Sequence, residues 1–129
     1  KPEDFVVATG QQSSIRDFVL MTAKELGIEL TFEGSGLDEI ARVTKIDPDK
    51  TLEIKLNDII VRISSEFFRP TEVDNLLGDS SKAREKLGWS PTISIEQLCR
   101  MMVEEDLNTA KQNSLLANHG YQISLPQKD

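Results

Sequence analysis

Apolar residues follow two kinds of spacing along the chain, and each spacing predicts a different element. Residues 5–8 form an unbroken apolar run, Phe-Val-Val-Ala, which is typical of a strand covered on both faces of a sheet. After a polar loop, Ser14 and Asp17 are spaced to cap a helix that Gly27 would end. Alternation at residues 28–32 then predicts a second strand. Strand, helix and strand in this order predict a βαβ-like unit.

The middle of the chain predicts three further short strands. Two of them, at residues 41–46 and 52–56, would lie on either side of a turn at residues 47–49, which read Asp-Pro-Asp. The third, at residues 59–63, is an apolar run interrupted only by one arginine.

Two short helices are predicted next. Proline is well tolerated in the first turn of a helix, so Pro70 is well placed to begin a helix that runs to residue 77. Asp79 can cap the other, over residues 80–87, which Gly88 would end.

The longest helix is predicted at residues 95–111, where Ser94 and Gln97 form a capping box. Its apolar positions recur at i, i+3 and i+4 and should bury against the sheet. They are Ile95, Leu98, Cys99, Met102, Val103, Leu107 and Ala110. From about residue 113 the sequence predicts a polar tail. The expected fold class is therefore α/β, with one domain over residues 1–129.

Charge and composition exclude several classes of function. The net charge is −7 and no basic run occurs, so a nucleic-acid partner is not expected. No apolar stretch approaches the roughly 18 residues that span a bilayer, so no membrane partner is expected either. The single cysteine, Cys99, cannot form an internal disulfide, which favours the cytoplasm.

The residues that catalysis or cofactor binding would need are missing from the sequence. The seven glycines nowhere form a dinucleotide-binding fingerprint after a strand. The only tyrosine, Tyr121, has Leu125 four residues on, so no Tyr-x-x-x-Lys pair exists. The lone histidine, His119, has no partner for a metal site or a triad, and Cys99 lies on an apolar helix face. We therefore predict no catalytic, cofactor-binding or metal-binding residue in this chain.

Two segments are candidates for ligand binding. The loop at residues 9–13 leads from the predicted first strand into a helix N-terminus, which favours an anion, although a plain capped turn is the better explanation. Arg69 lies between a predicted strand and Pro70, and its planar donor fork suits a diphosphate. Glu72 could accept hydrogen bonds from ribose hydroxyls. An ion pair between Arg69 and Glu72 is the alternative.

The sequence around Arg69 resembles the carboxy-terminal part of GDP-mannose 4,6-dehydratases, which belong to the extended short-chain dehydrogenase/reductases. The most specific part of the resemblance is Phe-Arg-Pro-Thr-Glu-Val at residues 68–73, followed by Leu-Leu-Gly-Asp at residues 76–79. Leu-Gly-Trp-x-Pro at residues 87–91 is shared more widely among nucleotide-sugar enzymes. Residues 64–68 read Ser-Ser-Glu-Phe-Phe where the family often has Asp-Pro-Arg-Tyr-Phe, and residues 37–55 match poorly.

The resemblance implies a small mixed substrate-binding lobe without the Rossmann lobe. Such enzymes convert GDP-mannose to GDP-4-keto-6-deoxymannose with NADP that is reduced and reoxidised within one turnover. The NADP site and the catalytic residues would lie in an N-terminal Rossmann region of the same enzyme, so this chain alone should be inactive. By position, Arg69 would contact the diphosphate and Glu72 the ribose. A homo-oligomer is expected. The alternatives are a lobe of another nucleotide-sugar epimerase or dehydratase, and a free-standing interaction module without enzymatic function.

Overall fold

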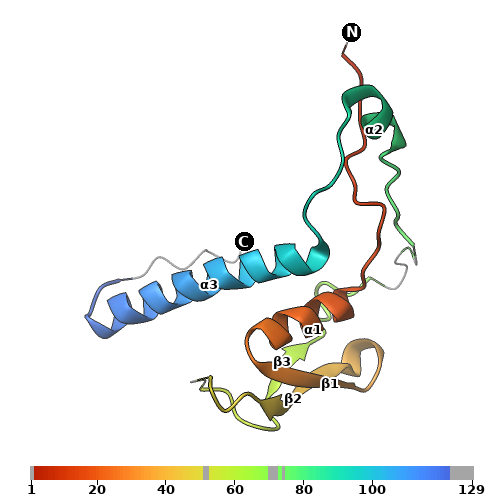
Figure 1. Cartoon of the computed structure of the whole chain (residues 1–129). Helices are drawn as coiled ribbons and strands as arrows, with labels where there is room; N and C mark the ends of the chain where they lie inside the picture. The colour runs from red at the N-terminus through yellow and green to blue at the C-terminus, as the bar shows by residue number, and fades with distance from the viewer. Residues whose placement is uncertain (1, 51–52, 70–72, 74, 123–129) are drawn as a thin grey trace.

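The computed structural model describes residues 2–50, 53–69, 73 and 75–122, and it combines a small antiparallel sheet with helices (Figure 1). The elements in chain order are α1 (Ile15–Glu25), β1 (Ile28–Glu33), the single 3-10 turn η1 (Gly36–Asp38), β2 (Ile40–Ile46), β3 (Ile59–Arg62), α2 (Ser81–Leu87) and α3 (Ile95–Asn118). Figure 1 shows α1 and the sheet at one end, α2 beside the N-terminal segment at the other, and α3 projecting sideways from between them. The mixed α/β character is confirmed.

The sheet is a meander in the order β1-β2-β3, in which each strand is antiparallel to its neighbour. Ile28 of β1 is opposite Ile46 of β2, and Leu30 is opposite Val43. Burial alternates along β1, as expected for a sheet with one face on a core and the other in water. The fully or nearly buried apolar side chains of this part of the molecule are Ala23 of α1, Ile28, Ala41 and Val43.

Helix α1 begins and ends at the residues that local chemistry predicted. Ser14 and Asp17 form a reciprocal capping box, in which the Asp17 amide donates to Ser14 Oγ at 3.0 Å and the Ser14 amide donates to Asp17 Oδ2 at 3.2 Å. At the other end Gly27 has φ +80°, a left-handed conformation that glycine adopts without a Cβ penalty. The predicted helix and the strand after it are confirmed.

The Asp17 carboxylate provides a test of this cap. Hydrogen bonds from the Ser14 hydroxyl, at 2.7 Å, and from its amide lower the pKa of Asp17. The folded chain thus favours the charged form of Asp17, and this preference stabilises the fold. The stabilisation is present above the pKa that Asp17 has in the unfolded chain and is lost as the pH falls through the lower pKa that it has in the folded chain. We expect Ser14→Ala to raise the pKa of Asp17 toward its ordinary value in an NMR titration of the carboxyl carbon.

A matched control for this titration is Ser94→Ala, which removes the equivalent hydroxyl at the start of α3. It should leave the pKa of Asp17 unchanged. An Asp17 pKa that stays equally low in Ser14→Ala would show that the hydroxyl does not hold the carboxylate.

The predicted strand at residues 5–8 is not a strand in this structure. The segment is extended but joins no sheet, and Val6 and Val7 are 54% and 67% exposed. A strand needs a neighbour for its backbone hydrogen bonds, and no described part of the chain supplies one. The predicted βαβ-like unit is therefore wrong, and the sheet that does form is wholly antiparallel.

The middle of the chain confirms some predictions and corrects others. Residues 41–46 lie in β2 and residues 59–62 form β3, and between them the Lys50 amide donates to the Asp47 carbonyl in the predicted turn. Residues 53–56 form no strand, and residues 51 and 52 lie outside the described part of the chain. The turn therefore leads into a loop rather than into another strand.

The short helix predicted at residues 70–77 is not found at the residues that are described. Residues 70–72 and 74 lie outside the described part, and residues 73 and 75–77 are not helical. Helix α2 is found, and Gly88 ends it with φ +64°. The Asp79 carboxylate accepts the Ser81 amide at 2.9 Å, so it satisfies an amide at the helix start although Ser80 occupies the N-cap position.

Helix α3 differs from the prediction in its length and in its packing. The capping box of Ser94 and Gln97 is confirmed. The helix continues to Asn118 rather than ending at residue 111, because helix-forming residues follow and the left-handed Gly120 comes only after them; residues 113–118, predicted as the start of a polar tail, therefore belong to the helix. None of the described helices is long and apolar enough to cross a membrane.

The apolar stripe of α3 does not bury against the sheet, because α1 already covers the apolar face of the sheet. The helix instead packs on α1, where Cys99 Sγ lies 3.4 Å from Thr22 Oγ1 and the Arg100 guanidinium lies 3.5 Å from the Glu25 carboxylate. Cys99 is the one buried member of the predicted stripe. Other members of the stripe are substantially exposed, namely Leu98, Met102 and Leu107.

Candidate functional site

A hollow of about 450 Å³ lies between the loop at residues 9–13 and the start of α3. The loop is one of the two segments considered as candidates for ligand binding from the sequence. Thr9, Gln11 and Ser13 form one wall of the hollow, and residues 91–95 with Gln97 and Leu98 form the other. No signal in the sequence brings these two walls together, because they come from segments about 80 residues apart and meet only through the fold.

The chemistry of the hollow suits neutral polar groups better than an anion. None of its lining residues is charged, and they offer hydroxyl and amide groups beside apolar side chains such as Ile93. Both nearby helix N-termini are capped by their own side chains, through Ser14 in α1 and Ser94 in α3, so part of their capacity to bind an anion is already used. The loop is therefore best described as a capped turn that forms the wall of a hollow.

Arg69 follows β3 and a turn in which the Phe67 amide donates to the Ser64 carbonyl. Arg69 is an exposed residue, and its side chain does not line the hollow. An exposed guanidinium can reach a diphosphate with its planar donor fork. Glu72 lies outside the described residues, so the structure does not place it relative to Arg69.

The structure shows that two aromatic residues beside Arg69 are exposed, which the sequence did not predict. Phe67 is 76% exposed and Phe68 44%, so the apolar run that leads into Arg69 is largely uncovered. The sequence pattern alone did not distinguish these rings from core residues, because phenylalanine after a strand is usually buried. Together with Arg69 they form a surface with both apolar and cationic character.

The residues that were considered for catalysis occupy structural positions. Cys99 is fully buried between α3 and α1. His119 is the C-cap residue of α3, and its Nδ1 lies 2.8 Å from the Leu115 carbonyl. In the part of the chain that the structure describes, no cluster of three or more histidine, cysteine or acidic side chains is arranged to hold a metal ion.

Comparison with known proteins identifies the chain's relatives. The family model described as GDP-mannose 4,6 dehydratase matches residues 1–102. A GDP-mannose 4,6-dehydratase of Yersinia enterocolitica is 52% identical over 125 residues, which is 97% of this chain and 34% of that protein. One from Vibrio cholerae is 51% identical over 95% of this chain and 33% of its own length. The human GDP-mannose 4,6 dehydratase is 34% identical over 88% of this chain and 28% of its own length.

The family description and the names of these relatives define one class of protein, the sugar-nucleotide dehydratases. Within that class, the chain belongs to the GDP-mannose 4,6-dehydratase family. It spans about a third of the length of the relatives it matches. The resemblance seen at residues 68–73 and 76–79 is thereby confirmed.

Proposed function

We propose that this chain is the carboxy-terminal, substrate-binding part of a GDP-mannose 4,6-dehydratase, which converts GDP-mannose to GDP-4-keto-6-deoxymannose. The observation that carries the proposal is 52% identity over 97% of the chain to a dehydratase about three times as long. The chain would bind the nucleotide end of the substrate, while the remaining length of the enzyme carries out the reaction.

Arg69 and Glu72 would make the polar contacts of this binding. The Arg69 guanidinium would donate two parallel hydrogen bonds to the diphosphate, and Glu72 would accept from the ribose hydroxyls. The exposure of Arg69 beyond the end of β3 supports this role, since a guanidinium buried in the core could not reach a ligand. Binding energy from the remote nucleotide would then fix the hexose in position for the reaction.

NADP would bind to the N-terminal Rossmann region of the enzyme, where it supplies the hydride transfer of the reaction. The glycines of this chain do not form a fingerprint that fits a dinucleotide, so we assign no NADP contact and no chemical step to its residues. Their part is to bind and orient GDP-mannose. We also propose that the whole enzyme is a cytoplasmic homo-oligomer.

The role of Arg69 is tested by Arg69→Ala in the longer dehydratase that contains this sequence. A lost hydrogen bond to a charged group costs about 1.5–3 kcal/mol, so calorimetry should find GDP-mannose bound about 10- to 150-fold more weakly. Arg69→Lys keeps the charge without the fork and should bind with intermediate affinity.

The matched control is Arg84→Ala, which removes an exposed arginine on α2. It should leave the affinity for GDP-mannose unchanged. Equal affinities of Arg69→Ala and the unmodified enzyme would remove Arg69 from the binding site.

A further inference from the structure

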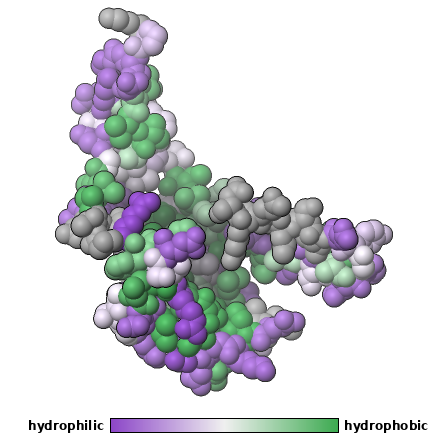
Figure 2. Space-filling view, turned by 180° about the vertical axis from the view of Figure 1, so that it is seen from behind, coloured by the Kyte–Doolittle hydropathy of each residue, from purple (hydrophilic) through white to green (hydrophobic). Residues whose placement is uncertain are grey.

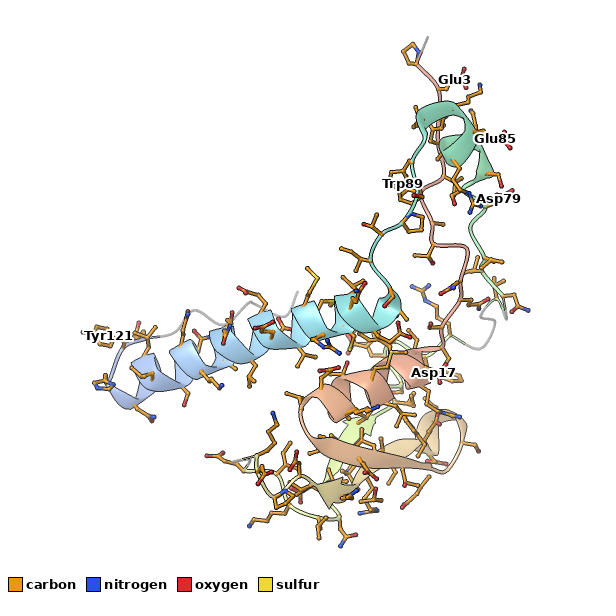
Figure 3. The ribbon with its side chains drawn as sticks, viewed as in Figure 1. Glu3, Asp17, Asp79, Glu85, Trp89 and Tyr121 are labelled. Atoms are coloured by element: carbon orange, nitrogen blue, oxygen red, sulfur yellow. The ribbon has the colours of Figure 1, made fainter. Side chains whose placement is uncertain are left out.

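The hollow between the loop at residues 9–13 and the start of α3 has the size of a small-molecule site. Its volume of about 450 Å³ falls within the roughly 300–1,000 Å³ that is usual for ligand pockets. Figure 3 shows Asp17, in the first turn of α1, near the start of α3, so the loop and the two helix starts converge at this place. Arg69 does not line the hollow, so a ligand here would not be the diphosphate that we assign to Arg69.

Hydrogen bonds within each wall fix the shape of the hollow. In the loop, the Thr9 hydroxyl accepts from the Gln11 amide and donates to the Gln11 carbonyl, both at 3.2 Å. In the opposite wall, the Ser94 amide donates to Gln97 Oε1 at 2.9 Å and the Gln97 amide donates to Ser94 Oγ at 3.2 Å. Both walls are therefore shaped before a ligand binds, which lowers the entropy cost of binding.

Three polar side chains of the hollow remain available to a ligand. The side-chain amide of Gln11 and the hydroxyls of Ser13 and Thr92 make no hydrogen bond within the part of the chain that the structure describes. All three residues are exposed, so a ligand in the hollow can reach them. They offer donors and acceptors from both walls without a formal charge.

Apolar side chains lie beside these polar groups. Ile93 and Leu98 also line the hollow, and they are 47% and 43% exposed. Figure 2 shows apolar residues at the surface where the part of the molecule that holds α2 meets the rest. A ligand that covers Ile93 and Leu98 and also pairs with the free polar groups is stabilised by both kinds of contact.

The residues that line the hollow disfavour several classes of ligand. None of these described residues is charged, which disfavours a phosphate or a carboxylate, and none is aromatic, which disfavours a stacked nucleobase. Neither wall belongs to a strand, so the hollow offers no sheet edge to an extended peptide. A pyranose sugar fits the remaining chemistry, because its ring has C–H groups on its faces and hydroxyls around its edge.

We propose that this hollow binds a neutral sugar in its pyranose form. A face of the ring covers Ile93 and Leu98. The hydroxyls at its edge exchange hydrogen bonds with Gln11, Ser13 and Thr92. The site does not depend on the proposed function, because only the residues of the hollow form it. Binding should be weak, with a Kd on the order of 1 mM, as the usual binding energy per atom gives for a ligand of this size.

An NMR titration of chain 1–129 with methyl α-mannopyranoside tests the proposal. The amide signals of residues 9–13 and 92–98 should shift, with half-saturation at about 1 mM, and those of β1 should not. Glycerol has hydroxyls but no ring and should bind at least about tenfold more weakly. Inorganic phosphate should not shift these signals. Absence of the shifts at about 50 mM mannoside, equal binding of glycerol, or phosphate binding in the hollow would each overturn the proposal.

Two variants, one in each wall, test the contacts. Gln11→Ala and Thr92→Ala each remove one neutral hydrogen-bonding group and should weaken mannoside binding by about two- to tenfold. The matched control is Thr31→Ala, which removes an exposed hydroxyl on β1 and should leave the affinity unchanged. Unchanged amide signals away from the hollow will show that each variant is folded. Unchanged affinity in either Gln11→Ala or Thr92→Ala would overturn the proposed site, since both walls must contribute to it.

Discussion

Chain 1–129 alone is expected to give no turnover of GDP-mannose in the presence of NADP. The sequence has neither a Tyr-x-x-x-Lys pair nor a dinucleotide fingerprint, and positioned groups of this kind normally supply the proton and hydride transfers. The two reactive side chains considered, Cys99 and His119, are respectively buried and engaged at a helix end. The measurement is the formation of the 4-keto sugar, followed over hours at high protein concentration.

The control is the longer dehydratase that we propose contains this sequence, assayed under the same conditions, which should turn the substrate over. Turnover by chain 1–129 above the protein-free background, retained through purification and lost on heating, would contradict the proposed division of labour. It would place reactive groups within residues 1–129.

Replacing Ile28 with alanine is expected to be the most damaging of the core truncations for stability. Ile28 is 3% exposed at the start of β1, opposite Ile46 and beneath α1. Isoleucine-to-alanine changes in a packed core cost about 2–5 kcal/mol, through lost burial and the cavity left behind. Net stabilities of whole domains are only about 5–15 kcal/mol, so urea unfolding should show a midpoint far below that of the unmodified chain.

Ile60→Ala makes the same chemical change on β3, where the side chain is 40% exposed. It should lower the free energy of unfolding much less, by about 1 kcal/mol or below, because the substitution removes little buried apolar area. Similar losses for both variants would mean that Ile28 is not in the core.

Local chemistry predicted the starts of α1 and α3 and the ends of α1 and α2 well. The capping boxes at Ser14 and Ser94 and the left-handed glycines at 27 and 88 act within a few residues, so the sequence next to them suffices. The antiparallel order of the sheet was not predictable in this way. The order depends on which strands pair in the folded chain. The run at residues 5–8 has the composition of a strand, but it pairs with no other strand in the described part of the chain.

The candidate site was predictable only in part. Arg69 is predicted from its neighbours in sequence, and the structure places it on the surface. The hollow beside the loop at residues 9–13 needed the fold, since Ile93 and Gln97 come from the other end of the chain. The stripe of α3 was read as core because periodicity reports an apolar face but does not report what covers it.

The nucleotide preference of the longer dehydratase tests the central claim most directly. Titration calorimetry with GDP, UDP and dTDP compares the three bases on the same diphosphate. If this chain binds the nucleotide end of GDP-mannose, GDP should bind at least about tenfold more tightly than the other two. Equal or tighter binding of UDP or dTDP would contradict the account.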